Sequence, residues 1–221
     1  MKKATRMMFL IVLVFGLTAC SPMVKDKNNA TPQPEPSHTQ ETPKPQAAQP
    51  SSRDYFPATP GSTWSYRGAG NEFASFTREV LFSSANQAQM KESNGGTVSA
   101  SIYEFLEGTL KRVYFQGESY QPANLLVKGF KSNESTVILK EPLQTGNEWT
   151  TGNGQGRIVQ TDAQVQTPAG TFNNCIKVEI SEKNSSALTY EYYGQGVGLV
   201  KREFVDGRTI ISSTLEKYQI K

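Results

Sequence analysis

The sequence predicts an all-β domain, built as a strongly curved antiparallel sheet or a partly closed barrel of about ten strands. Three observations support this fold class. Apolar and polar residues alternate over several short runs, glycine-containing turn signals separate these runs, and no long segment shows a clean helical period. Short strands joined by tight turns pair with their neighbours in an antiparallel arrangement.

The predicted strands follow one another along the folded part of the chain. The clearest runs lie at residues 76–82, 102–106, 113–115, 172–180, 189–193, 197–204 and 209–218. The hairpin signals are Asn94-Gly95-Gly96, Glu107-Gly108 and Asp206-Gly207, where glycine supplies the positive φ that tight turns require. The best helical candidate, residues 123–130, is short and equally compatible with a loop.

A short motif occurs twice and predicts two weakly similar halves. Pro57-x₃-Gly61-x₂-Trp64 recurs as Pro142-x₃-Gly146-x₂-Trp149 and includes both tryptophans, so the halves would span residues 57–141 and 142–221. Beyond the motif the two halves share little identity, and chance similarity is the alternative. We expect Pro and Gly to fix a turn that delivers each Trp into the core, because a Trp in a strand buries a large apolar area.

The N-terminus indicates export. Lys2, Lys3 and Arg6 precede an apolar run from Met7 to Gly16, and small residues follow, which is typical of a secretory signal peptide over residues 1–19. Leu17-Thr18-Ala19-Cys20 resembles the lipobox of bacterial lipoproteins. The resemblance implies that Cys20 carries fatty acyl chains such as palmitate and becomes the new N-terminus. The domain would then lie on the extracytoplasmic side of the cell membrane or the outer membrane.

Two alternatives to a lipidated N-terminus are an ordinary cleaved signal and an N-terminal membrane helix. A spanning helix needs about 20 apolar residues, and the run before Cys20 is shorter. Residues 20–52 are predicted to form a disordered tether behind the lipidated Cys20, since seven of the 12 prolines lie there with few bulky apolar residues. The β domain would span residues 53–221.

Charge and residue usage limit the chemistry of this domain. Three of the 23 Lys and Arg residues lie in residues 1–19, which leaves 20 against 20 Asp and Glu, so nucleic acid is an unlikely partner by charge. The only histidine, His38, lies in the tether, which excludes Ser-His-Asp, Cys-His and histidine metal sites from the domain. We therefore expect no catalytic residue, no metal and no cofactor.

Several other reactive side chains have a simpler interpretation. The fourteen glutamates of the domain are scattered singly and fit solvated strand faces, although a glycosidase-like pair of carboxylates stays open. Cys175 is predicted to be a small, half-buried apolar side chain. Tyr190 and Tyr192 share one strand face and Tyr193 lies on the other. Packing explains this group, and the alternative is a ligand surface for a sugar or an apolar pocket wall.

Three sequence blocks between residues 55 and 218 carry a family resemblance. They are Tyr55-Phe56-Pro57-x₂-Pro60-Gly61-x₂-Trp64-x-Tyr66, Thr167-Pro168-Ala169-Gly170-Thr171-Phe172-x₂-Cys175-Ile176-Lys177-Val178 and Tyr193-Gly194-x-Gly196-Val197-Gly198-Leu199-Val200-Lys201. Together these blocks resemble uncharacterised bacterial exported proteins and lipoproteins. The resemblance implies no particular activity, and at the level of fold it is similar to the curved antiparallel sheets of bacterial lipoprotein carriers.

Three functions are compatible with these observations. The first is a non-catalytic, membrane-anchored envelope or surface lipoprotein with a binding or structural role, whose partner is a protein, a glycan or an apolar ligand. The second is a carrier or sensor with a lipid-like ligand in the concave face of the sheet, and the third is a hydrolase with paired carboxylates. An enclosed apolar cavity favours the carrier, a filled interior with exposed Tyr or Trp favours the binding module, and a cleft with paired glutamates favours the hydrolase.

Overall fold

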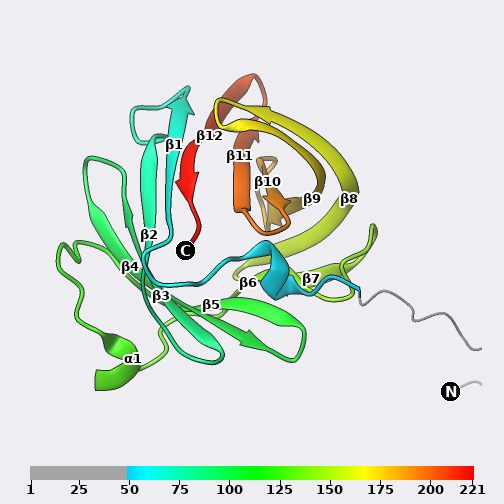
Figure 1. The fold of residues 1–221 in the computed structure, drawn as a ribbon. Helices are drawn as coiled ribbons and strands as arrows, with labels where there is room; N and C mark the ends of the chain where they lie inside the picture. The colour runs from blue at the N-terminus through cyan, green and yellow to red at the C-terminus, as the bar shows by residue number, and fades with distance from the viewer. Residues whose placement is uncertain (1–48) are drawn as a thin grey trace, which may run out of the picture. The chain divides into compact units, whose positions relative to one another are not determined.

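The computed structural model describes residues 49–221, which form one antiparallel sheet of twelve strands with almost no helix (Figure 1). The predicted all-β class and the curved, partly closed sheet are confirmed, with two more strands than expected. The predicted signal peptide, Cys20 and most of the predicted tether lie outside the described residues. Within residues 49–221, no helix is long and apolar enough to cross a membrane.

The strands follow the chain without interruption by long helices. They are β1 Thr63–Ala69, β2 Phe76–Ser83, β3 Gln87–Ser93, β4 Val98–Leu106, β5 Thr109–Gln116, β6 Thr136–Lys140, β7 Glu148–Thr151, β8 Gly154–Thr167, β9 Gly170–Glu182, β10 Leu188–Gly194, β11 Gly198–Asp206 and β12 Thr209–Gln219. A 3-10 helix, η1, spans Ser52–Tyr55, and the one α-helix among residues 49–221, α1, spans Leu125–Lys128. α1 lies inside the segment that was the best helical candidate.

Two six-stranded meanders make up the sheet, one from β1–β6 and the other from β7–β12. The strand order is β6-β5-β4-β3-β2-β1-β12-β11-β10-β9-β8-β7, so β1 and β12 join the meanders and β6 and β7 form the two edges. The sheet curls until these edges meet. Across this seam the carbonyl oxygen of Val137 accepts hydrogen bonds from Trp149 Nε1 at 3.2 Å and Thr151 Oγ1 at 2.8 Å. Side chains therefore close the barrel where backbone pairing stops.

The two copies of the sequence motif form the same turn at the start of each meander. Gly61 and Gly146 both have positive φ, at 82° and 92°. The Gly61 N–H donates to Val80 O at 2.9 Å, and the Gly146 N–H donates to Ile158 O at 2.8 Å. Val80 and Ile158 each donate back, at 3.0 Å, to the residue after the glycine. Each turn is thus fixed to the second strand of its own half.

Both tryptophans lie inside the barrel wall. Trp64 is 4% exposed and Trp149 is 6% exposed, and each indole N–H donates to a backbone carbonyl, that of Val197 in the case of Trp64. The ring of Trp149 lies on Gly156 of the neighbouring strand, where a Cβ would come within 2.5 Å of the indole. Gly156 therefore provides the space in which this Trp packs.

The N-terminal segment plugs one end of the barrel. Phe56, directly after η1, is buried with its ring centroid 4.7 Å from that of Tyr103. The backbone N–H of Ser52 donates to Glu141 Oε1 at 2.7 Å, and Ser51 is held to Asp54 by a capping box. Ser51 and Ser52, which were expected in the tether, lie against the β domain.

Candidate functional site

A cavity of about 300 Å³ remains inside the barrel, and its lining is charged. Both meanders contribute to its lining, and so does Phe56. The polar lining consists of three arginines, two glutamates, two tyrosines and several groups near the β6–β7 seam: Arg78, Arg112, Arg202, Glu182, Glu191, Tyr103, Tyr193, Thr136, Thr151 and Asn153. The region of the interior around this cavity is therefore polar, while the remainder is packed with apolar side chains.

Arg78 and Arg202 point into the barrel because side chains alternate between the two faces of a strand. In β2, Arg78 lies between Phe76 and Val80 on the face that points into the barrel, and it is 7% exposed. In β11, Arg202 lies on the same face as the buried Val200. Neither arginine was among the residues expected from the sequence to form a site, although an arginine at an apolar position of an alternating run is a readable signal.

Two inward-pointing carboxylates, the half-buried Glu92 and the buried Glu191, each face an arginine directly across a strand pair. Glu92 is opposite Arg78 and accepts from its Nε at 2.6 Å. Glu191 is opposite Arg202 and accepts from its Nε at 2.8 Å. The Tyr193 hydroxyl donates to the other oxygen of Glu191 at 2.5 Å. The expectation that the glutamates cover solvated strand faces is therefore wrong for Glu92 and Glu191, because the register of the sheet pairs them with inward-pointing cations.

A third ion pair joins the same region. Arg112 of β5 binds Glu134 through Nε to Oε1 and through Nη2 to Oε2, the latter at 3.3 Å. This fork-to-fork geometry holds the guanidinium plane in one orientation. The Arg112 guanidinium also lies over the aromatic ring of Phe115, with Cζ 5.1 Å from the ring centroid.

The ion pairs keep both carboxyl groups ionised. Burial by itself raises the pKa of Glu92, but Arg78 and Arg202 lower it below its ordinary range. Burial acts in the same way on Glu191, and Arg202 together with the Tyr193 hydroxyl lowers its pKa. Burial tends to lower the pKa of Arg202, and Glu191 and Glu92 outweigh this effect, so its pKa is raised. At neutral pH the cavity is therefore lined by fixed opposite charges.

The three tyrosines of the candidate ligand surface do not lie together. Tyr193 is buried and lines the cavity, whereas Tyr190 and Tyr192 lie on the opposite face of β10 and are half-buried. The ammonium group of Lys177 lies 4.2 Å from the Tyr190 ring centroid and 5.4 Å from that of Tyr192. Tyr192 also donates to Glu203 at 3.0 Å. The outer pair is thus an aromatic and cationic patch, separate from the cavity.

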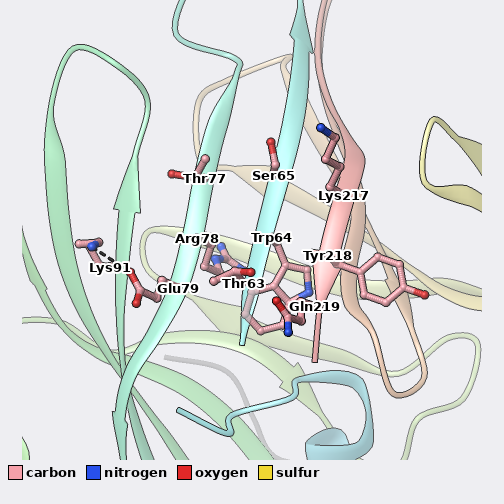
Figure 2. Close-up of a pocket in the computed structure, with 10 residues that line it drawn as sticks. All are labelled: Thr63, Trp64, Ser65, Thr77, Arg78, Glu79, Lys91, Lys217, Tyr218 and Gln219. Carbon is pink, nitrogen blue, oxygen red and sulfur yellow. Dashed lines mark ion pairs between the residues drawn. The ribbon is translucent and has the colours of Figure 1, made fainter. Parts of the chain in front are cut away.

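A larger and shallower groove of about 500 Å³ lies on the outward face of β12, β1, β2 and β3 (Figure 2). Its exposed side chains are polar, among them Thr63, Thr77 and Lys217, and Lys91 forms an ion pair with Glu79 at 2.8 Å. In Figure 2 the Tyr218 ring extends away from these groups. The groove therefore offers hydroxyl and ammonium groups at its surface, and the buried Trp64 and Arg78 complete its lining.

Neither the thiol nor a metal site adds chemistry to the described part of the chain. Cys175 is fully buried, and burial raises the pKa of its thiol to about 11, so it is protonated at neutral pH. Within residues 49–221, no cluster of three or more His, Cys, Asp or Glu side chains is arranged to hold a metal ion.

Comparison with known proteins gives partial matches. A family model described as DUF3108-like matches residues 124–216, which is less than half of the chain. No curated protein sequence matches the chain. The family similarity covers β6 to most of β12 and omits β1–β5, and with them Arg78 and Arg112.

Two crystal structures are similar to this chain. A candidate lipoprotein from Parabacteroides distasonis ATCC 8503 is 19% identical with a TM-score of 0.46, over 75% of this chain and 98% of that chain. A candidate exported protein with a YmcC-like fold from Bacteroides fragilis NCTC 9343 is 14% identical with a TM-score of 0.47, over 74% of this chain and 98% of that chain. Similarities at this level carry no conclusion about the function of this chain.

Proposed function

We propose that the protein is a membrane-anchored envelope lipoprotein whose β domain acts by binding and not by catalysis. The resemblance of Leu17-Thr18-Ala19-Cys20 to a lipobox supports the anchor. The observation that carries the binding role is the cavity inside the barrel, which is lined by the ionised Glu191 and by three arginines that are each held by a carboxylate. Such a site is organised to hold fixed charges in place around a ligand.

A hydrolase receives less support from the same geometry. A glycosidase of the usual kind needs one carboxylic acid that stays protonated near neutral pH, which requires a raised pKa. The pKa values of Glu92 and Glu191 are both lowered by their arginine partners. Neither carboxyl group is therefore suited to donate a proton to a leaving group.

A carrier for an apolar ligand also receives less support. The apolar part of the interior is filled by side chains, among them Met90, Leu110, Leu139 and Leu215. The remaining space is bordered by Arg78, Arg112 and Arg202, and an acyl chain placed there would remove water from these charges without replacing its hydrogen bonds. A polar ligand is the better match.

The membrane anchor is tested by metabolic labelling of the full chain with a clickable fatty acid in a bacterial host. The chain contains two cysteines, which provide a matched pair of variants. Cys20→Ala is expected to abolish the label and to leave the precursor unprocessed. Cys175→Ala is expected to keep the label, because that thiol is buried in the β domain. Fatty acid still incorporated into the Cys20→Ala chain would contradict the proposal.

A further inference from the structure

We propose that the cavity binds a small anionic ligand that carries a carboxylate or phosphate group, and that Arg112 and Arg202 contact this group. This inference rests on the proposed binding function and names the chemical class of the ligand. It follows from which charged groups face the cavity, which of their donors are already used, and how much space is left.

The wall of the cavity presents more cationic than anionic groups. Arg78, Arg112 and Arg202 line it, whereas their partners Glu92 and Glu134 do not. These two carboxylates therefore orient the guanidinium groups from behind, as supporting hydrogen-bond partners do in many binding sites.

The two carboxylates that line the cavity take up only part of the donor capacity of the arginines. Both oxygens of Glu191 are engaged, one by Arg202 and the other by the Tyr193 hydroxyl. Glu182 is exposed, at the end of β9. The groups that a ligand meets inside the cavity are therefore mainly N–H donors.

Two arginines are within reach of a ligand. The side chains of Arg112 and Arg202 are 29% and 38% exposed, whereas that of Arg78 is only 7% exposed. Arg202 uses Nε for Glu191, which leaves its two Nη groups for another acceptor. Arg112 uses Nε and Nη2 for Glu134, which leaves its Nη1 group. A guanidinium fork matches the spacing of two oxygens on a carboxylate or a phosphate.

The size of the cavity limits the ligand. About 300 Å³ is at the lower end of the range for small-molecule sites, so a metabolite-sized anion fits and a diacyl lipid does not. Thr136 and Asn153, from the two sides of the β6–β7 seam, add neutral polar groups to the lining. They can bind the uncharged part of such a ligand.

The test is isothermal titration calorimetry of the full lipidated chain in neutral detergent. Citrate and inorganic phosphate are the probes, and sodium chloride keeps the ionic strength constant. Two exposed lining residues give variants with opposite expected effects. Asn153→Asp adds a negative charge and should weaken binding by about tenfold, and Glu182→Gln removes one and should strengthen binding by a similar factor. Arg67→Gln removes a positive charge from an exposed ion pair outside the cavity and should leave the affinity unchanged.

Saturable binding of citrate, phosphate or both supports the inference if Asn153→Asp weakens the affinity and Glu182→Gln strengthens it. The probe that binds more tightly shows whether the site prefers a carboxylate or a phosphate group. A loss of folding cannot produce the expected strengthening by Glu182→Gln. A folded chain that binds neither probe, or binds with the same affinity in Asn153→Asp and Glu182→Gln, overturns it. A neutral compound that co-purifies with the chain would keep the proposed binding function and overturn the anionic ligand.

Discussion

At the scale of single residues, the buried ion pairs are more important for stability than the surface ones. Arg78→Met leaves the carboxylate of Glu92 without its partner in the barrel interior, and this is expected to cost about 3–5 kcal/mol. Arg67→Gln removes the exposed pair with Glu216 and is expected to cost less than about 1 kcal/mol. Urea unfolding of both variants measures the difference. Equal losses would show that the buried pair has no special role.

The same carboxylates predict how stability depends on pH. The pKa values of Glu92 and Glu191 are lowered in the folded chain from an ordinary value of 4.5. Their contribution is therefore complete above pH 4.5 and is lost as the pH falls through the lowered values, because the unfolded chain then binds more protons.

Urea midpoints measured from about pH 7 down to about pH 3 should fall steeply in the acid range. Glu191→Gln is the matched variant, and its midpoint should be lower at neutral pH and should decrease less in acid. A steeper acid loss in Glu191→Gln than in the unmodified chain would contradict the assignment.

Part of this site was predictable from the sequence at the residue scale. Arg78 occupies an apolar position in the alternation of β2, so its inward direction could be read from its neighbours Phe76 and Val80. Its partner could not, because Glu92 lies opposite only through the register of β2 and β3. Cys175 was expected to be a small, half-buried apolar side chain, and the structure buries it fully.

At the scale of the strands, the packing of Trp149 depends on a glycine in the next strand. Gly156 lies opposite Trp149 in the β7–β8 hairpin, and a Cβ there would come within 2.5 Å of the indole. Gly156→Ala is therefore expected to destabilise the domain by about 1–3 kcal/mol through overpacking. Gly117→Ala is the control, since a Cβ at Gly117 meets nothing within 4 Å.

Thermal unfolding followed by tryptophan fluorescence measures both glycine variants. Gly156→Ala should lower the melting temperature and shift the emission to longer wavelength, and Gly117→Ala should do neither. A melting temperature unchanged in Gly156→Ala would mean that the Trp149 ring moves freely at the hairpin.

Strand β8 shows why some elements escape detection from sequence. Its buried positions alternate over residues 154–158 and again over 163–167, but register shifts separate the two stretches, and several of the buried positions hold small residues such as Gly154, Gly156 and Ala163. The sequence of β8 therefore shows no clear alternation of large apolar and polar residues, even though β8 is the longest strand of the described domain. The runs with Phe, Val, Ile and Tyr, such as residues 172–180, were predicted because their inward side chains are large.

At the scale of the whole domain, the sheet topology accounts for the two sequence motifs. Each motif opens a six-stranded meander, and the turn, its hydrogen bonds and the buried Trp are the same in both. The order of strands within each meander follows from the hairpin signals. The pairing of β1 with β12 joins residues far apart in the sequence, and no local pattern specifies it.

The N-terminal plug predicts where the independent domain begins. Residues 53–221 were expected to fold without the preceding segment, but Ser52 donates to Glu141 and Phe56 fills one end of the barrel. A chain of residues 49–221 should therefore be more stable than 53–221, by about 1–3 kcal/mol for the lost hydrogen bonds.

A chain of residues 57–221 should have a free energy of unfolding lower than that of 53–221 by about 3–5 kcal/mol, because it lacks the buried Tyr55 and Phe56. Urea unfolding of the three chains orders their stabilities. Equal stability of 49–221 and 57–221 would show that the plug is dispensable.

Native mass spectrometry of the lipidated chain, purified from its own host in gentle detergent, tests the central claim most directly. The account predicts one small acidic molecule bound per chain, which fits the cavity of about 300 Å³ and is depleted in the Asn153→Asp variant. It also predicts that Arg67→Gln, which changes charge outside the cavity, retains this molecule. A bound diacyl lipid or hydrocarbon retained in the Asn153→Asp variant would contradict the account and favour an apolar carrier.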